Sequence, residues 1–134
     1  MAVKKQILIM LLLSALIYLG CSKSDSPQID NYIIKIDSIV VPDTILFGNN
    51  LIVKFYGKVG ENGCYAFYKF DVDYELNTTS ITSWGRFTHY EACPENLPVL
   101  YGKELIIYNL SKGNNIIKAI QPDGDALSSE VFVK

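Results

Sequence analysis

Residues 64–76 read CYAFYKFDVDYEL, and this stretch carries the pattern that decides the fold. Apolar and charged side chains alternate along it, which is typical of a β-strand with one face against a core and the other in water. The face predicted to point into the core carries Ala66, Tyr68, Phe70, Val72 and Tyr74. The opposite face is predicted to carry Lys69, Asp71, Asp73 and Glu75, with Tyr65 and Phe67 at its start.

Six further runs of the chain are rich in Ile, Val, Tyr and Phe, and Gly, Pro, Asn and Asp separate them, as expected for strands and turns. These runs are Tyr32–Val41, Asn50–Val59, Thr79–Tyr90, Leu100–Leu110, Asn115–Gln121 and Leu127–Lys134. In the second of them, Leu51, Val53 and Phe55 share one face and are predicted to be buried. No run has the spacing of an amphipathic helix. About seven short strands at this spacing predict an all-β fold, an antiparallel β-sandwich.

The chain begins with the features of a secretory signal peptide. Lys4 and Lys5 are followed by an uncharged run, Ile7–Leu19, and then by Gly20 and Cys21. This run of about a dozen residues is shorter than the ~20 that span a bilayer as a helix, so we expect it to be removed. A Cys directly after the small residue resembles a bacterial lipoprotein signal, in which the thiol carries a diacylglycerol. Cleavage nearby without lipidation is the alternative.

Lipidation at Cys21 predicts the organisation of the chain. Residues 1–20 would be the lipoprotein signal peptide, residues 21–30 a flexible polar tether, and residues 31–134 a single β-sandwich domain. Acyl chains on Cys21 would hold the protein on a membrane, because each buried methylene contributes about 0.8 kcal/mol. The first expected partner is therefore a membrane, and the expected location is the cell envelope.

The charge balance excludes one class of partner. The chain has 134 residues, with 12 Lys and Arg against 14 Asp and Glu. Loss of Lys4 and Lys5 with the signal peptide leaves 10 basic and 14 acidic residues, a net charge of −4. Nucleic acid binding needs a concentrated basic surface, so no nucleic acid partner is expected. The same balance argues against docking onto anionic lipid by charge.

The cysteine count predicts a disulfide. The chain has three cysteines, and acylation of Cys21 leaves Cys64 and Cys93 as a pair in an exported domain, where disulfides form. In the chain-entropy model, closing a loop of this length stabilises the fold by roughly 3.5 kcal/mol. Two free thiols, or half of a metal site, are the alternatives. A chain with a single His lacks the paired short spacings of a structural zinc site.

The sequence offers little for catalysis or metal binding. His89 is the single imidazole, and no Gly-x-Ser-x-Gly nucleophile motif is present, so no catalytic residue is expected and the protein is predicted not to be an enzyme. The row Asp71, Asp73 and Glu75 could supply oxygens to Ca²⁺, but a flat row does not wrap an ion and a solvated face is the simpler interpretation. Asp123-Gly124-Asp125 similarly indicates a turn. No metal and no cofactor are predicted.

Aromatic residues are abundant, with nine Tyr, six Phe and one Trp. Most of them are expected to fill the core. Tyr65 and Phe67, predicted to face away from the core, and Trp84 are candidates for a ring-lined ligand-binding patch, because exposed rings offer a large contact area at low entropic cost.

Several local features together resemble the small immunoglobulin-like lipoproteins of Bacteroidota. They are the lipoprotein start, the run Ile36–Ile45 that leads to Gly48, Gly63-Cys64-Tyr65, Cys93-Pro94, and a closing hairpin around Pro122–Asp125. The resemblance implies an immunoglobulin-like fold and an outer-membrane location. Ser22–Asp25 is similar to the short polar stretches that direct surface lipoproteins of this group to the outer face of that membrane. Trp84 is not placed as the Trp of antibody domains is, which leaves open whether the predicted bridge crosses the two sheets.

These features lead to one functional expectation and two alternatives. We expect a membrane-anchored envelope lipoprotein whose immunoglobulin-like domain binds a protein or glycan partner without catalysis. The first alternative is a glycan-binding module that uses exposed aromatic rings. The second is a structural or protease-inhibitory envelope protein. A fold alone does not choose among them, because one fold hosts many functions.

Overall fold

The computed structural model describes residues 26–134, which form two β-sheets packed face to face and contain no helix. The predicted signal peptide and the predicted lipidation site Cys21 lie outside the described residues. The strands are β1 (Ile29–Ile33), β2 (Ser38–Val40), β3 (Thr44–Ile45), β4 (Leu51–Lys58), β5 (Tyr65–Glu75), β6 (Thr78–Thr88), β7 (Val99–Ile107), β8 (Gly113–Ile120) and β9 (Ala126–Val133). The predicted all-β sandwich is confirmed.

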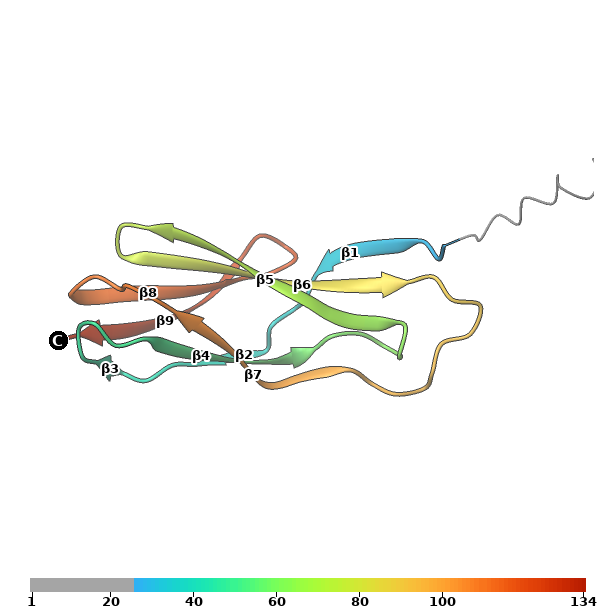
Figure 1. Cartoon of the computed structure of the whole chain (residues 1–134), viewed down its shortest axis with the longest axis horizontal. Coiled ribbons are helices and arrows are strands. Elements are labelled where there is room, and N and C mark those ends of the chain that lie inside the picture. The colour runs from blue at the N-terminus through green and yellow to red at the C-terminus, as the bar shows by residue number, and fades with distance from the viewer. Residues whose placement is uncertain (1–25) are drawn as a thin grey trace, which may run out of the picture.

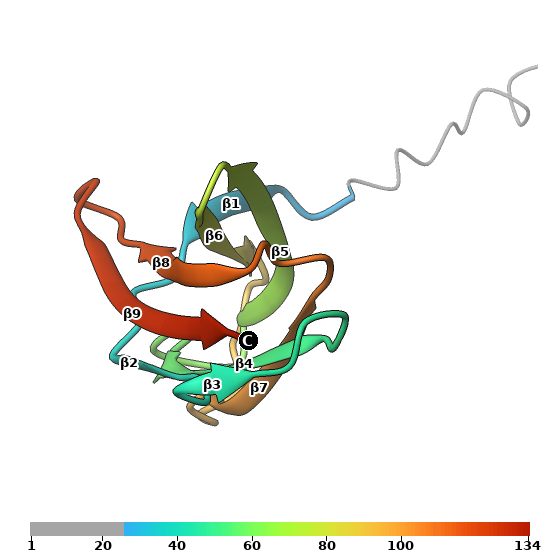
Figure 2. The same cartoon turned by 90° about the vertical axis from the view of Figure 1, so that its left-hand side faces the viewer.

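The larger sheet has the order β1-β6-β8-β9-β3, with β5 paired to β6, and the smaller sheet has the order β2-β4-β7. Figure 2 shows β8 and β9 in one layer and β4 and β7 in the other. Strand β6 organises the larger sheet, because β5 pairs with almost its whole length along one edge. On the other edge β8 pairs with Thr78–Thr82 and β1 pairs with Trp84–Thr88. Three strands thus meet side by side at the end of β6 where β1 lies (Figure 1).

Three details of the architecture differ from the prediction. Residues 26–134 form nine strands rather than seven, because the run predicted as one strand, Tyr32–Val41, divides into β1 and β2, and because β3 forms between two predicted runs. Between them the chain leaves one sheet for the other: the Ile34 N–H donates to Ser83 in the larger sheet, and the Asp37 N–H donates to Tyr56 in the smaller one. The pairing is also mixed, since β6–β8 and β3–β9 are parallel. The first strand begins at Ile29, two residues before the predicted start of the domain.

The core lies between the two sheets. The predicted inward face of β4 is confirmed, because Leu51, Val53 and Phe55 are all 0 % exposed. The Phe55 ring reaches across the interface to the Phe70 ring of β5, with 4.6 Å between the ring centroids. The other buried apolar residues of the core cluster are Ile34, Ile36, Val59, Ile81, Leu100, Ile107, Leu110, Ile117, Ala119, Val131 and Val133.

The predicted faces of β5 are wrong in its first half. Ala66 and Tyr68 are exposed, whereas Tyr65 and Phe67 pack against the core. A β-bulge causes the reversal: Phe67 pairs with Gly85 and Lys69 pairs with Trp84, which leaves Tyr68 without a partner residue on β6. One extra residue shifts the alternation by one position, so side chains before the bulge take the face opposite to the predicted one.

Beyond the bulge the prediction for β5 holds in part. Phe70 and Val72 pack against the core, as predicted, and Lys69, Asp71, Asp73 and Glu75 are exposed. Tyr74 lies on the same face of β5 as Phe70 and Val72 but is 55 % exposed, because it is near the end of the strand, where the core no longer covers it.

A close backbone approach makes Gly57 of β4 sensitive to substitution. A Cβ atom at Gly57 would lie 2.6 Å from the carbonyl oxygen of Lys35, in the segment where the chain changes sheets. We expect Gly57→Ala to lower the free energy of unfolding by about 1–3 kcal/mol, because backbone atoms must shift to relieve the overlap. Denaturant unfolding measures this, with Lys58→Ala at the exposed neighbouring position as control. Equal midpoints of denaturant unfolding for the two variants would contradict the close approach of the backbone at Gly57 to that at Lys35.

Tyr32 connects the two layers, and its environment leads us to expect that the folded protein loses stability at alkaline pH. Its hydroxyl donates to the carbonyl oxygen of Val59, and its ring packs edge-on against Tyr65 at 5.7 Å. Burial, with a smaller contribution from Tyr65, raises the pKa of Tyr32 from 10.0 to about 12. Because the folded state disfavours the phenolate, this contribution to stability is complete below about pH 10 and is lost as the pH rises towards about 12.

The measurement compares the free energy of unfolding at about pH 9 and about pH 11.5, on either side of the unfolded tyrosine pKa. The alkaline loss should be smaller in Tyr32→Phe than in the wild type. Tyr101→Phe is the control, because Tyr101 is 89 % exposed and should leave the alkaline loss unchanged. An identical loss in all three proteins would show that Tyr32 ionises as freely when folded as when unfolded.

Candidate functional site

The bulge in β5 builds a small site on the outer face of the larger sheet. Trp84 points away from the core, because its neighbours Ser83 and Gly85 are buried. At the bulge, Tyr68 and Lys69 are both exposed and lie beside Trp84, whereas regular alternation would have sent one of them inward. Bulges that re-aim a side chain in this way recur next to functional sites.

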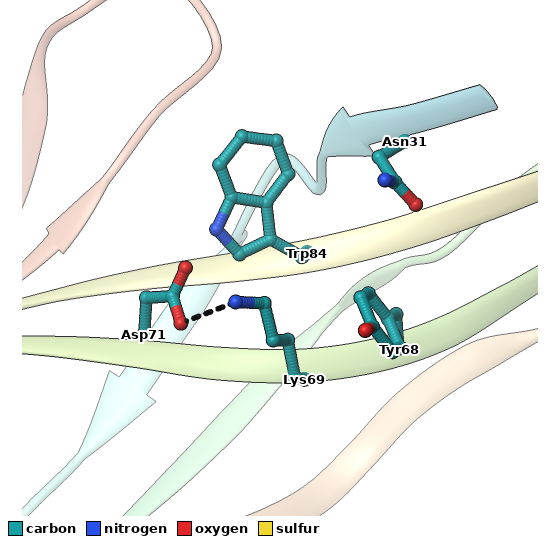
Figure 3. Close-up of a pocket in the computed structure, with 5 residues that line it drawn as sticks. All are labelled: Asn31, Tyr68, Lys69, Asp71 and Trp84. Carbon is teal, nitrogen blue, oxygen red and sulfur yellow. Dashed lines mark hydrogen bonds and ion pairs between the residues drawn. The ribbon is translucent and has the colours of Figure 1, made fainter.

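These residues line a shallow depression of about 270 Å³ (Figure 3). Its lining comes from three adjacent strands: one residue from β1, three from β5 and one from β6, namely Asn31, Tyr68, Lys69, Asp71 and Trp84. In Figure 3 the indole of Trp84 stands above β6, with its nitrogen on the side of Asp71. The site therefore offers one large ring surrounded by polar side chains.

Charged groups fix the geometry on the β5 side of the depression. The Lys69 ammonium donates to an Asp71 carboxylate oxygen at 2.7 Å, and both side chains remain about half exposed. The guanidinium of Arg86, two residues after Trp84 on the same face, lies 3.3 Å from the centroid of the Tyr68 ring. Such cation–π stacking holds a cation and a ring face to face and restricts the motion of both.

Two donors in this region lack an acceptor. Trp84 Nε1 and Arg86 Nε are both buried, and neither has a hydrogen-bond partner among the described residues. A buried donor without an acceptor costs about 1–3 kcal/mol. Because both nitrogen atoms are shielded from solvent, this cost is carried by the fold itself.

The structure does not bring the three predicted patch residues onto one surface. Trp84 lies on the outer face, but Tyr65 packs between Tyr32 and Phe87, and the Phe67 ring contacts Phe70 at 4.8 Å. The predicted outward orientation of Tyr65 and Phe67 is wrong because the bulge reverses their face.

Sequence reasoning missed Asn31, Tyr68 and Arg86. One signal could have revealed Tyr68: the apolar spacing in β5 is two residues from Tyr65 to Phe67, then three to Phe70. A break of this kind within an alternating strand is the mark of a bulge. No comparable local signal exists for Asn31 or Arg86, because their neighbours come from other strands.

A second hollow, of about 330 Å³, lies elsewhere on the surface and is lined by Tyr74, Tyr108 and Asn109. Both tyrosines are more than half exposed, and Asn109 adopts a positive φ of 57°. This hollow has no charged side chain in its lining. It therefore offers less chemistry for recognition than the depression around Trp84.

The predicted disulfide between Cys64 and Cys93 is confirmed, with 5.2 Å between the two Cα atoms. Cys64 directly precedes β5, and Cys93 lies in the loop between β6 and β7. The Gly63 N–H also donates to the Pro94 carbonyl at 2.8 Å, so the bridge and this bond hold the loop together against the start of β5. The bridge thus ties a loop to a strand.

His89 follows β6 and contacts Asp30 of β1, with 2.6 Å between the imidazole Nε2 and a carboxylate oxygen. Its ring also packs edge-on against Phe87 at 4.6 Å. The hydrogen bond from His89, followed by one from Gln28, lowers the pKa of Asp30. Both members of the pair are exposed, so the contact helps to hold β1 on β6 at the surface.

The acidic row on β5 does not form a metal centre in the structure. Asp71 is paired with Lys69, and within residues 26–134 no group of three or more His, Cys, Asp or Glu side chains is placed to hold a metal ion. The same part of the chain has no helix that is long and apolar enough to span a bilayer.

Comparison with known proteins adds no relative: no protein-family model, curated protein or solved structure matches this chain. The functional argument therefore rests on the chemistry of the depression around Trp84.

Proposed function

We propose that this chain is a lipid-anchored protein of the bacterial cell envelope whose β-sandwich binds another macromolecule without catalysis. One observation carries the proposal. The depression around Trp84 gathers rings and charged side chains on an outer face of the sheet, where they add nothing to the core. A bulged strand that exposes Tyr68 and leaves buried donors without acceptors is difficult to explain by stability alone.

The anchor in this proposal comes from the sequence pattern that ends at Cys21. Ile29, at the start of β1, is eight positions after Cys21, and such a segment reaches about 25–30 Å when extended. Asn31, which lines the depression, is the third residue of β1. An anchored domain would therefore carry its binding surface close to the membrane, in a position to contact other envelope components.

The immunoglobulin-like form of the sandwich is part of the same proposal. The closing antiparallel hairpin of β8 and β9 and the placement of β4 between β2 and β7 support it. The parallel pairing of β6 with β8 is a departure from the antiparallel sheets of immunoglobulin domains.

Oxidative footprinting tests whether anything covers the depression. The full chain is labelled in intact envelopes of the host that expresses it and, separately, after purification in detergent. Trp84 and Tyr68 should be protected in the envelope and reactive after purification. Tyr101, 89 % exposed and in the other sheet, is the internal control and should react in both states.

Equal labelling of Trp84 in both states would overturn the proposal that this surface is occupied.

The proposal that the domain binds without catalysis has a separate test. A measurable turnover that disappears in His89→Ala or Asp73→Ala would show that the domain is an enzyme.

A further inference from the structure

We propose that the depression around Trp84 is a sugar-binding site, in which a pyranose ring stacks on the indole and its hydroxyl groups bind the Lys69–Asp71 pair. The inference rests on the proposed function, because it names the ligand class of the same surface. The aromatic ring and the ion pair each contribute one part of the recognition.

The indole supplies the stacking surface. A pyranose ring presents a face of C–H groups, which carry slight positive charge, and the face of an aromatic ring carries negative charge. Trp84 lies in β6 with paired strands on both sides, so the sheet holds it and little entropy is lost when a ligand stacks.

The Lys69–Asp71 pair supplies polar recognition beside the ring. Each hydroxyl of a sugar both donates and accepts, and this pair offers an ammonium donor and a carboxylate acceptor 2.7 Å apart. Two neighbouring hydroxyls can therefore bind to the two groups at once. The side chains are 47 % and 52 % exposed, so they are accessible to a ligand without rearrangement.

Tyr68 forms a further wall of the site and is held in place by Arg86, which lies outside the lining. The guanidinium of Arg86 stacks on the Tyr68 ring, 3.3 Å from its centroid, and restricts the motion of that ring. The lining thus combines two aromatic rings with the polar groups of Asn31, Lys69 and Asp71. Sugars, which carry an oxygen on nearly every carbon, satisfy such a lining better than apolar ligands do.

The size and surroundings of the depression favour a glycan over a protein partner. The depression has a volume of about 270 Å³ and accommodates part of a glycan. Stable protein interfaces bury about 1,200–2,000 Å² around an apolar centre. Here the outer face of β5 continues from Asp71 to the exposed carboxylates of Asp73 and Glu75, which a protein would have to desolvate. A glycan needs only the ring and the polar groups around it.

An oligosaccharide array tests the inference directly. The full chain, purified in detergent, is applied to immobilised neutral and acidic oligosaccharides, and affinity is then measured for the sugars that retain it. Because the chain has one Trp, the change in intrinsic tryptophan emission on adding those sugars reports on this site alone. We expect saturable retention and a saturable change in Trp84 emission.

Matched variants locate the binding. Trp84→Ala should weaken the affinity about tenfold or more, because the stacking surface is lost. Asp71→Asn, at an exposed position where folding should be preserved, should also weaken it. Tyr101→Ala removes an 89 % exposed ring from the other sheet and should leave the affinity unchanged. Unchanged affinity in both Trp84→Ala and Asp71→Asn would overturn the assignment of the site.

The array and the footprint together separate the two proposals. If no sugar is retained but Trp84 is still protected in the envelope, the surface binds a ligand of another class and the sugar inference is wrong. If no sugar is retained and Trp84 is not protected, both the inference and the proposed function are wrong.

Discussion

Replacing Phe55 with alanine should lower the free energy of unfolding by about 3–5 kcal/mol, the range for truncating a buried aromatic ring. Phe55 is 0 % exposed and lies in β4, the central strand of the smaller sheet. Its ring contacts Phe70 of the opposite sheet at 4.6 Å, so the substitution opens a cavity where the two layers meet. Small β domains have a total stability of about 5–15 kcal/mol, which makes a loss of this size severe.

Chemical denaturation of the wild type and Phe55→Ala measures this effect. Tyr101→Ala is the matched control, because it also truncates an aromatic ring but at a position that is 89 % exposed. We expect the control to stay within about 0.5 kcal/mol of the wild type. A loss below about 1 kcal/mol in Phe55→Ala would mean that the two sheets do not pack through this ring.

Breaking the Cys64–Cys93 bridge should have the second large effect. The bridge closes a loop with a sequence separation of 29. The chain-entropy model gives about 3.5 kcal/mol for a loop of this length, because the bridge restricts the unfolded chain. The midpoint of thermal unfolding should therefore fall when reductant is added.

The double variant Cys64→Ala/Cys93→Ala is the control for the reductant. Its midpoint should be low and should not change when reductant is added. The loop between β6 and β7 should also become more susceptible to protease in this variant, because Cys93 no longer fixes it against β5. The same midpoint for the oxidised and reduced wild type would show that the bridge contributes nothing to the folded state.

The two stability experiments also bear on the functional proposals. Phe70 packs against Phe55 and lies two residues after the bulge at Tyr68. The core contacts of β5 thus hold its register on both sides of the bulge, with Phe67 inward before it and Phe70 inward after it. Correct packing of these rings is what keeps Tyr68 and Lys69 on the outer face beside Trp84.

Much of the framework followed from the sequence. Alternation in residues 51–55 correctly predicted that Leu51, Val53 and Phe55 are buried, because a regular strand places residues at this spacing on one face, and in β4 the apolar face meets the core. Composition and turn residues predicted an all-β sandwich, and the cysteine count predicted the Cys64–Cys93 bridge. These features depend on local periodicity and on counting, which a sequence records directly.

The candidate site depended on tertiary structure. Alternation shows which side chains share a face within one strand, but the face that meets the core is set by register with the neighbouring strand. In β5 the bulge at Tyr68 changes that register, and so the predicted orientation of Tyr65 and Phe67 was wrong. The neighbours of Trp84 were equally hidden, because Asn31 comes from a strand 53 positions earlier in the sequence.

The sequence by itself thus determined the fold class, the buried face of β4 and the disulfide. Tertiary structure alone decided the passage from β1 to β2 between sheets, the parallel pairing of β6 with β8, and the assembly of a depression from three strands. The reason is the range of the interactions. Periodicity and composition express contacts within a strand, whereas strand order, register and bulges are fixed by long-range packing that minimises the free energy of the whole sandwich.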